Sequence, residues 1–152
     1  MIDFALTADA VAPQLLGCTL THAGVSIRLT EVEAYLGAED SAAHTFNGKT
    51  PRNAAMFGPP GRFYVYISYG IHRNVNIVCA PDGTGQGCLL RGGEIIEGAD
   101  IAFARRGTTD FHNLARGPGN LGKALGFTLE DNHQPIQIVE RTSEPEWVRG
   151  PR

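Results

Sequence analysis

Glycine and proline recur along the whole chain and leave few stretches in which a long helix could form. Nineteen glycines and nine prolines occur among the 152 residues. Both residue types favour turns and interrupt helices, so the spacing predicts many turns joined by short elements. A chain of this length usually forms one domain and can bury a single core. We therefore expect one domain spanning residues 1–152.

The short elements expected between these turns are mostly strands. A helix is predicted at 7–17, where Thr7 can cap the start and Pro13 can kink the interior. Alternating, β-branched or aromatic runs predict strands at 18–21, 25–35, 63–69, 74–80, 87–96 and 136–139. Two further helices, each followed by a glycine, are predicted at 98–106 and 118–125. This order predicts the α+β class, with a mostly antiparallel sheet and peripheral helices.

The run at 25–35 raises the question of which strand face is buried. Side chains repeat every second residue along a strand, so one face would carry Val25, Ile27, Leu29, Glu31, Glu33 and Tyr35. Carboxylates on an apolar face are costly unless they are paired or functional. The alternative is a bulge near Thr30, which would turn Glu31 and Glu33 outward. In the run at 87–96, Gly92-Gly93 predicts a bulge or sharp bend.

Charge is unevenly distributed along the chain. The formal net charge of −3, taken alone, disfavours a surface that binds polyanions. Residues 41–81, however, contain no Asp or Glu and include four basic residues, Lys49, Arg52, Arg62 and Arg73. All four tyrosines lie between positions 35 and 69, and basic residues interleaved with aromatics suit binding to unstacked bases. The alternative is that the aromatics fill a strand pair and the arginines are merely solvated.

The sequence has no signature of a membrane-spanning or secreted protein. It contains no stretch of about 18 apolar residues, so no membrane span is expected. Its first ten residues do not resemble a signal peptide. Three cysteines without CxxC spacing argue against a disulfide framework and against a thiolate zinc site, and they predict free thiols in a reducing cytosol. We therefore expect a cytoplasmic protein that is not secreted. The GPGN sequence at 117–120 is a candidate phosphate cradle at a helix start, although such starts are common without a ligand.

Several motifs follow one another between about residue 15 and the end of the chain. They are TEVEAYLGAEDSAAH at 30–44, TPRN at 50–53, MFGPPG at 56–61, YVYISYGIHRNVNIV at 64–78, LLR at 89–91, EIIEGA at 94–99 and LARGPGNLGKALG at 114–126. In order and spacing this series resembles the alkyladenine (3-methyladenine) DNA glycosylase family. The resemblance implies a single α+β domain with a curved antiparallel sheet, similar to the C-terminal domain of methionyl-tRNA formyltransferases.

The same resemblance implies an activity. Members of the family flip a damaged purine out of duplex DNA and hydrolyse its N-glycosidic bond with water, in base excision repair. The substrates implied are 3-methyladenine and, less directly, 7-methylguanine, hypoxanthine and ethenoadenine. No cofactor or metal is implied. The expected partner is double-stranded DNA containing damaged purines, bound in the bacterial cytoplasm by a monomer.

Site residues follow from the matched motifs, one by one. The resemblance implies that Glu33 is the general base and that Arg91 helps to position the water and the DNA backbone. It implies a base pocket of Tyr35, His44, Tyr66 and Asn76, with Tyr69 as the wedge that enters the duplex. The expected phosphate contacts are Arg52, Arg73, Gly119 and Lys123. An aromatic base pocket favours electron-poor, cationic purines.

The chain departs from the family pattern in two places. His72 and Arg73 stand where some relatives have an aromatic residue. The chain also ends at the GPR of 150–152, where family members continue, so we expect that it lacks the family's C-terminal segment. Two rival hypotheses remain open. One is a module that binds damaged DNA without catalysis. The other is a structural or RNA-binding domain of the same fold, which would leave Glu33 unexplained.

Overall fold

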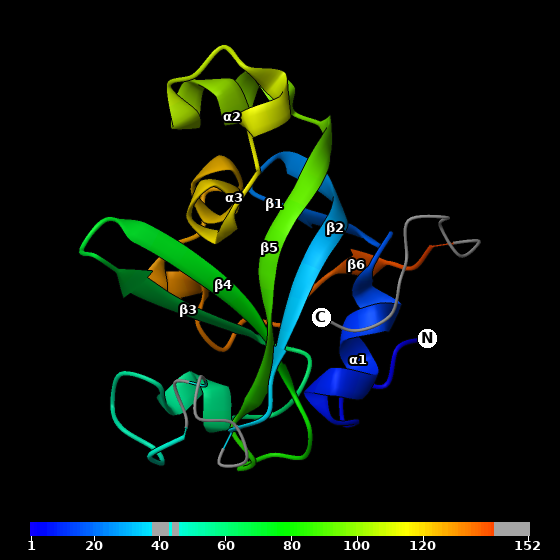
Figure 1. Ribbon diagram of the computed structural model, residues 1–152, viewed down its shortest axis with the longest axis vertical. Helices are drawn as coiled ribbons and strands as arrows, with labels where there is room; N and C mark the ends of the chain where they lie inside the picture. The colour runs from blue at the N-terminus through cyan, green and yellow to red at the C-terminus, as the bar shows by residue number, and fades with distance from the viewer. Residues whose placement is uncertain (38–42, 44–45, 142–152) are drawn as a thin grey trace.

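The computed structural model describes residues 1–37, 43 and 46–141, and these residues form a six-stranded sheet (Figure 1). Every neighbouring pair is antiparallel, in the order β3-β4-β5-β2-β1-β6. The strands are β1 (Thr19–His22), β2 (Val25–Tyr35), β3 (Phe63–Ser68), β4 (His72–Cys79), β5 (Gln86–Glu97) and β6 (Ile138–Val139). The α+β class with an antiparallel sheet is therefore confirmed, whereas the likeness to formyltransferase domains stays a prediction.

Short helices connect and cover these strands. The α-helices are α1 (Ala8–Leu15), α2 (Ala99–Arg106) and α3 (Pro118–Ala124), and the 3-10 helices are η2 (Ala54–Phe57), η3 (Phe111–Asn113) and η4 (Leu129–Asp131). The three α-helices lie where the sequence predicted them. Thr7 is the N-cap residue of α1 without a side-chain hydrogen bond, and α1 contains Pro13. The 3-10 helices were not predicted, because a single turn carries too little periodicity to be recognised.

Strand β2 changes its buried face near Thr30. The register of β2 against β5 shifts between Leu29 and Glu31, which leaves Thr30 as an extra residue. Leu29 is fully buried before this bulge, and Val32 is buried after it. The expectation that Glu31 and Glu33 share the buried aliphatic face is therefore wrong, and the alternative of a bulge is confirmed. The bulge reverses the alternation because it adds one residue to a pattern of period two.

The partner strand is irregular at the same place, as Gly92-Gly93 predicted. Gly92 lies opposite Glu31, and Gly93 lies opposite Leu29. A Cβ atom on Gly93 would lie 2.5 Å from the carbonyl oxygen of Arg28, so only glycine permits so close an approach. Bulges of this kind increase the local twist of a strand pair. Figure 1 shows β2 and β5 as a long twisted ribbon, from which the β3–β4 hairpin projects to one side.

The main core lies on the face of the sheet that the α-helices cover. Its largest members include Leu15, Leu20, Ile27, Leu29, Ile77, Leu90, Leu121, Leu125 and Phe127. A second, smaller cluster contains Ala55, Met56, Tyr64 and Val78. Tyr64 and Val78 alternate with core residues along β3 and β4, so this cluster lies on the opposite face. The bulge in β2 turns Glu33 and Tyr35 toward that second face.

Helix α3 packs against β4 with no room for a side chain between them. A Cβ atom on Gly122 would overlap the carbonyl oxygen of Arg73, and one on Gly119 would lie 2.6 Å from Nδ1 of His72. Glycine therefore allows the helix to rest directly on the strand backbone. The contact lies at the start of β4, next to the turn of the β3–β4 hairpin, which carries several of the predicted site residues.

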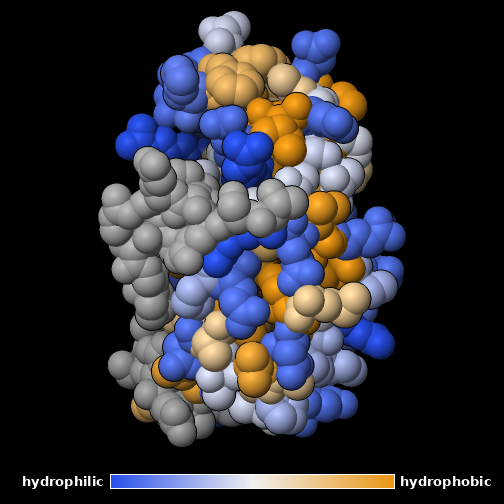
Figure 2. All heavy atoms as spheres, turned by 90° about the vertical axis from the view of Figure 1, so that its right-hand side faces the viewer, coloured by the Kyte–Doolittle hydropathy of each residue, from blue (hydrophilic) through white to orange (hydrophobic). Residues whose placement is uncertain are grey.

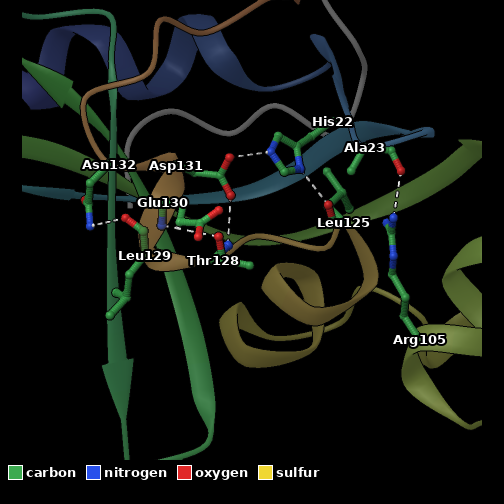
Figure 3. Close-up of polar contacts among 9 residues, drawn as sticks. All are labelled: His22, Ala23, Arg105, Leu125, Thr128, Leu129, Glu130, Asp131 and Asn132. Carbon is green, nitrogen blue, oxygen red and sulfur yellow. Dashed lines mark hydrogen bonds and ion pairs between the residues drawn. The ribbon is translucent and has the colours of Figure 1, made fainter.

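A polar clasp joins the β1–β2 turn to the chain after α3 (Figure 3). The ring nitrogens of His22 lie 2.6 Å from the Leu125 carbonyl oxygen and 2.9 Å from Oδ1 of Asp131. The imidazole also stacks on Phe127, with ring centroids 3.9 Å apart. Arg105 of α2 donates to the Ala23 carbonyl oxygen at 2.8 Å. The clasp fastens the β1–β2 hairpin to α2 and to η4.

The outer edge of β3 is capped by side chains and by loop backbone. The amide of Asn132 accepts from the N–H of Val65 and donates to the carbonyl oxygen of the same residue. Arg52 donates to the Ile67 carbonyl oxygen at 2.7 Å, and backbone bonds join Phe63 to the segment at 133–134. These bonds occupy groups that would otherwise pair with a strand of another molecule.

The surface on the side of α1 and β6 mixes apolar and polar residues (Figure 2). A groove of about 540 Å³ lies there between the N-terminal residues and β6, lined by Ile2, Phe4, Ile136 and Ile138 among others.

Cys18, Cys79 and Cys88 are buried thiols. Among the described residues, no helix has the length and apolar character that a membrane crossing requires.

Candidate active site

The second face of the sheet gathers most of the predicted site residues. Glu33 of β2 pairs with Leu89, Leu89 pairs with Asn76, and Asn76 pairs with Tyr64, so these residues form one row across four strands. Tyr35 follows two residues after Glu33 and points to the same side. At the usual strand spacing, Asn76 lies about 10 Å from Glu33 across the sheet. Several residues predicted from the sequence, among them Glu33, Tyr35 and Asn76, therefore lie on one face of the sheet.

The Glu33 carboxylate is held by two donors, one on each oxygen. The Tyr35 hydroxyl donates to Oε1 at 2.9 Å, and Nη1 of Arg91 donates to Oε2 at 2.8 Å. The side chains of Glu33 and Arg91 are 34% and 38% exposed, so solvent and ligands can reach the pair. Each carboxylate oxygen has two lone pairs, and one on each oxygen remains for a further donor such as water.

The phenols around this carboxylate are shifted toward their protonated forms. Burial, followed by the hydrogen bond to Glu33, raises the pKa of Tyr35. Burial also raises the pKa of Tyr66, and the negative charge of Glu33 adds to this effect. Both phenols therefore stay neutral at physiological pH and can act as donors.

A hollow of about 810 Å³ lies beside Tyr66, between the β3–β4 hairpin and the loop before η2. Its lining includes Asn47, Arg52, Asn53, Tyr66, Ser68, Tyr69 and Asn74. Glu33, Tyr35, Asn76 and Arg91 are not part of this lining. Tyr66 connects the hollow to the residues around Glu33. Its side chain lines the hollow, and the charges of Glu33 and Arg91 both act on the pKa of its phenol. A cavity of this size accommodates a flat ring compound.

The tip of the β3–β4 hairpin presents Tyr69 almost entirely to solvent. Its side chain is 94% exposed, and its backbone has a φ of +53°, in the left-handed region that is uncommon for residues other than glycine. Gly70 follows with a φ of +73°. Ile71 beside it is 75% exposed. An aromatic side chain this exposed contributes little to the core, so burial does not explain its position at the tip.

The predicted phosphate contacts fall in two places. Arg73 is exposed on β4, and Gly119 lies against His72, whose ring is 6.5 Å from that of Tyr69. Lys123 is exposed in the last turn of α3. Arg52 lies instead at the outer edge of β3 and lines the hollow. The expectation for His44 concerns a residue outside the described ranges.

Two residues at this surface were not recognised in the sequence. Asn74 is buried, lines the hollow and donates to the Ser68 hydroxyl at 3.0 Å. It lies two residues before Asn76, and strand alternation was a signal that could have identified it. Arg116 is exposed and its backbone pairs with Gly92, next to Arg91. That contact joins distant parts of the chain, and no local pattern predicts it.

The chemistry available at this surface is that of a carboxylate and an arginine beside aromatic rings. No group of three or more His, Cys, Asp or Glu side chains that could hold a metal ion occurs within residues 1–37, 43 and 46–141. A carboxylate whose free lone pairs face solvent can accept a proton from water. A carboxylate of this kind, on the same face of the sheet as a hollow with room for a flat ring, is suited to acid–base chemistry.

Comparison with known proteins shows the family to which the chain belongs. The sequence model for methylpurine-DNA glycosylases matches residues 2–152. The chain belongs to the methylpurine-DNA glycosylase family, which confirms the resemblance of its motifs. A Corynebacterium efficiens protein named "Putative 3-methyladenine DNA glycosylase" is 67% identical over 99% of this chain and 82% of its own length. Proteins of the same name are 64% identical in Corynebacterium glutamicum strain ATCC 13032, over 99% and 83%, and 47% identical in Rhodopseudomonas palustris, over 98% and 74%.

Proposed function

We propose that this chain hydrolyses the N-glycosidic bond of alkylated purines in duplex DNA, with 3-methyladenine as its principal substrate. The observation that carries the proposal is the Glu33 carboxylate, which Tyr35 and Arg91 hold beside an aromatic hollow. Release of 7-methylguanine, hypoxanthine and ethenoadenine by this chain is to be tested as well. We place this reaction in the bacterial cytoplasm and assign it to a monomer bound to double-stranded DNA.

Glu33 is the general base of the proposed reaction. Its carboxylate takes a proton from a water molecule while the water oxygen bonds to C1′ of the deoxyribose. The C1′–N bond breaks, its electron pair leaves with the purine, and an abasic sugar remains. The negative charge of Glu33 also stabilises the positive charge that develops on the sugar. Arg91 holds the carboxylate in place through its bond to Oε2.

Aromatic stacking selects the base in this proposal. Tyr35 and Tyr66 stack on the flipped purine, His44 closes the pocket, and Asn76 crowds the 2-amino position of guanine. Stacking contributes about 1–3 kcal/mol per base, and a cationic alkylated purine gains a further cation–π attraction. Asn76 is 2% exposed and its amide donates to the Tyr64 carbonyl oxygen, so the side chain is fixed in position.

The hairpin tip opens the duplex in this proposal. Tyr69 enters the space that the flipped nucleotide leaves, and its exposure at the hairpin turn suits that task. Arg52, Arg73, Gly119 and Lys123 contact phosphates on either side. Flipping costs a few kcal/mol and is easiest at damaged positions, so the wedge contributes to selecting damaged bases.

The first test is a Glu33→Gln variant assayed on methylated duplex DNA. Loss of the carboxylate is expected to slow release of 3-methyladenine by about 100-fold or more, while DNA binding is retained. Glu31→Gln is the matched control, because it makes the same change two residues away on the same strand, and it is expected to stay within about twofold of wild type. Undiminished release by Glu33→Gln would refute the mechanism. Binding of abasic-site DNA by wild type without any base release would indicate a damage-binding module instead.

A further inference from the structure

The hydroxyl of Tyr35 makes a contact that stacking on a base does not explain. It donates to Oε1 of Glu33 at 2.9 Å, while Arg91 donates to Oε2 at 2.8 Å. The two donors therefore act on different oxygens of one carboxylate. A ring used only for stacking needs no hydroxyl, since phenylalanine offers the same aromatic face.

The backbone fixes donor and acceptor relative to each other. Glu33 pairs with Leu89 and Tyr35 with Gly87 in the ladder between β2 and β5, and both side chains leave the same face of β2. Only side-chain torsions remain free. The Glu33 side chain is 34% exposed, and a carboxylate on a flexible stem samples several rotamers in solvent. The hydroxyl and the guanidinium limit this freedom from two directions.

Tyr35 keeps its proton throughout the pH range in which the site would work. Burial and the bond to Glu33 raise the pKa of its phenol, so the hydroxyl is a permanent donor to the carboxylate. One lone pair of Oε1 and one of Oε2 are then occupied. The remaining lone pairs have a fixed direction and stay accessible to water.

We propose that Tyr35 is a positioning residue for Glu33. Its hydroxyl orients the carboxylate so that a free lone pair points at the attacking water, separately from the stacking of its ring on the base. The inference rests on the proposed function, in which Glu33 is the general base. The ring and the hydroxyl then have two tasks that substitutions can separate.

The test compares Tyr35→Phe with wild type. Single-turnover release of 3-methyladenine is measured on dimethyl sulfate-treated duplex DNA with protein in excess, and binding is measured on a duplex with a tetrahydrofuran abasic analogue. Loss of the hydroxyl is expected to lower the single-turnover rate about tenfold and to change the dissociation constant by less than about twofold. Tyr35→Leu also removes the ring and is expected to weaken base release further.

A second variant restores a donor at the same place. Tyr35→4-aminophenylalanine keeps the ring and supplies an N–H at the para position, and it is expected to recover most of the rate lost in Tyr35→Phe. The inference is overturned if Tyr35→Phe retains the wild-type rate, if it weakens binding as much as it lowers the rate, or if the amino variant is no faster than Tyr35→Phe. Should Tyr35→Phe not fold, the amino variant decides, because a rate more than tenfold below wild type would contradict a donor role. Failure of the proposed function gives a different result from failure of this inference. If the proposed function is wrong, the wild-type protein itself releases no base.

Discussion

At the scale of single residues, burial and hydrogen bonding decide what the tyrosines can do. Tyr69 is exposed at a turn, Tyr35 donates to a carboxylate, and Tyr64 is 1% exposed in the small cluster on the site's face. The same residue type thus serves as a hydrogen-bond donor and as a packing element, and in the proposed function it also serves as the wedge. The sequence showed that the tyrosines were gathered in one region, and the exposure of each side chain separates their roles.

Tyr64 gives a prediction about alkaline pH. Burial raises the pKa of Tyr64 from its ordinary value of 10.0 to about 12. Above pH 10 the unfolded chain loses this proton while the folded chain keeps it, so stability is complete below pH 10 and falls as the pH rises toward 12. Each pKa unit corresponds to about 1.4 kcal/mol, so Tyr64 accounts for a loss of about 2–3 kcal/mol.

Urea unfolding of wild type and Tyr64→Phe between pH 8 and pH 12 measures this loss. The variant has no phenol to ionise at this position, so its stability is expected to fall less steeply above pH 10. Other groups that titrate in this range affect both proteins equally. Parallel curves for the two proteins would show that burial of Tyr64 does not shift its ionisation.

At the scale of elements, a single extra residue determines what β2 presents to each face. The bounds of β2 agree with the predicted run at 25–35, but the bulge at Thr30 transfers Glu33 from the core face to the site face. Glycines act at the same scale in α3, where the helix rests on the backbone of β4. Both devices set the position of the strands that carry the site.

The contact between α3 and β4 predicts a large effect of one methyl group. In Gly122→Ala the new Cβ would overlap the Arg73 carbonyl oxygen, which is backbone and cannot rotate away. Overpacking of this kind costs about 3 kcal/mol of unfolding free energy, which denaturant titration measures. Lys123→Ala, at the exposed next position of the same helix, is the control and is expected to change stability by less than about 0.5 kcal/mol. Equal stability of the two variants would contradict the close packing.

At the scale of the whole molecule, the net charge of −3 hides a basic region. Residues 41–81 contribute four positive charges without any acidic residue, and the β3–β4 hairpin lies within this range. The rest of the chain carries the acidic excess. A molecule of this kind can bind DNA through one region while its total charge remains negative.

Salt dependence measures this regional charge. The logarithm of the affinity for duplex DNA is expected to fall linearly with the logarithm of the salt concentration, by about 0.9 per phosphate neutralised. Arg73→Ala is expected to reduce the slope by about 1 and to weaken binding to damaged and undamaged DNA alike. Arg28→Ala is the control, because Arg28 lies in the sheet beside Glu94 and away from the hairpin. An unchanged slope for Arg73→Ala would remove Arg73 from the proposed phosphate contacts.

The sequence by itself determined the strands and α-helices of this protein and pointed to most of its candidate site residues. Alternation, glycines and prolines act within a few residues of one another, so strands such as β2 and helices such as α2 could be predicted. The motifs around Glu33, Tyr66 and Arg91 pointed to a family that the whole-chain comparison confirms. These signals are local in the chain or carried by residue type.

Only the tertiary structure decided which face Glu33 occupies and which groups hold it. Arg91 lies 58 residues from Glu33 in the chain, and their bond exists because β2 and β5 pair with a shifted register. Arg116 beside Gly92 and Asn74 in the hollow depend on contacts of the same kind. A bulge changes the face of every residue after it, and its position depends on the partner strand, which the local pattern does not encode.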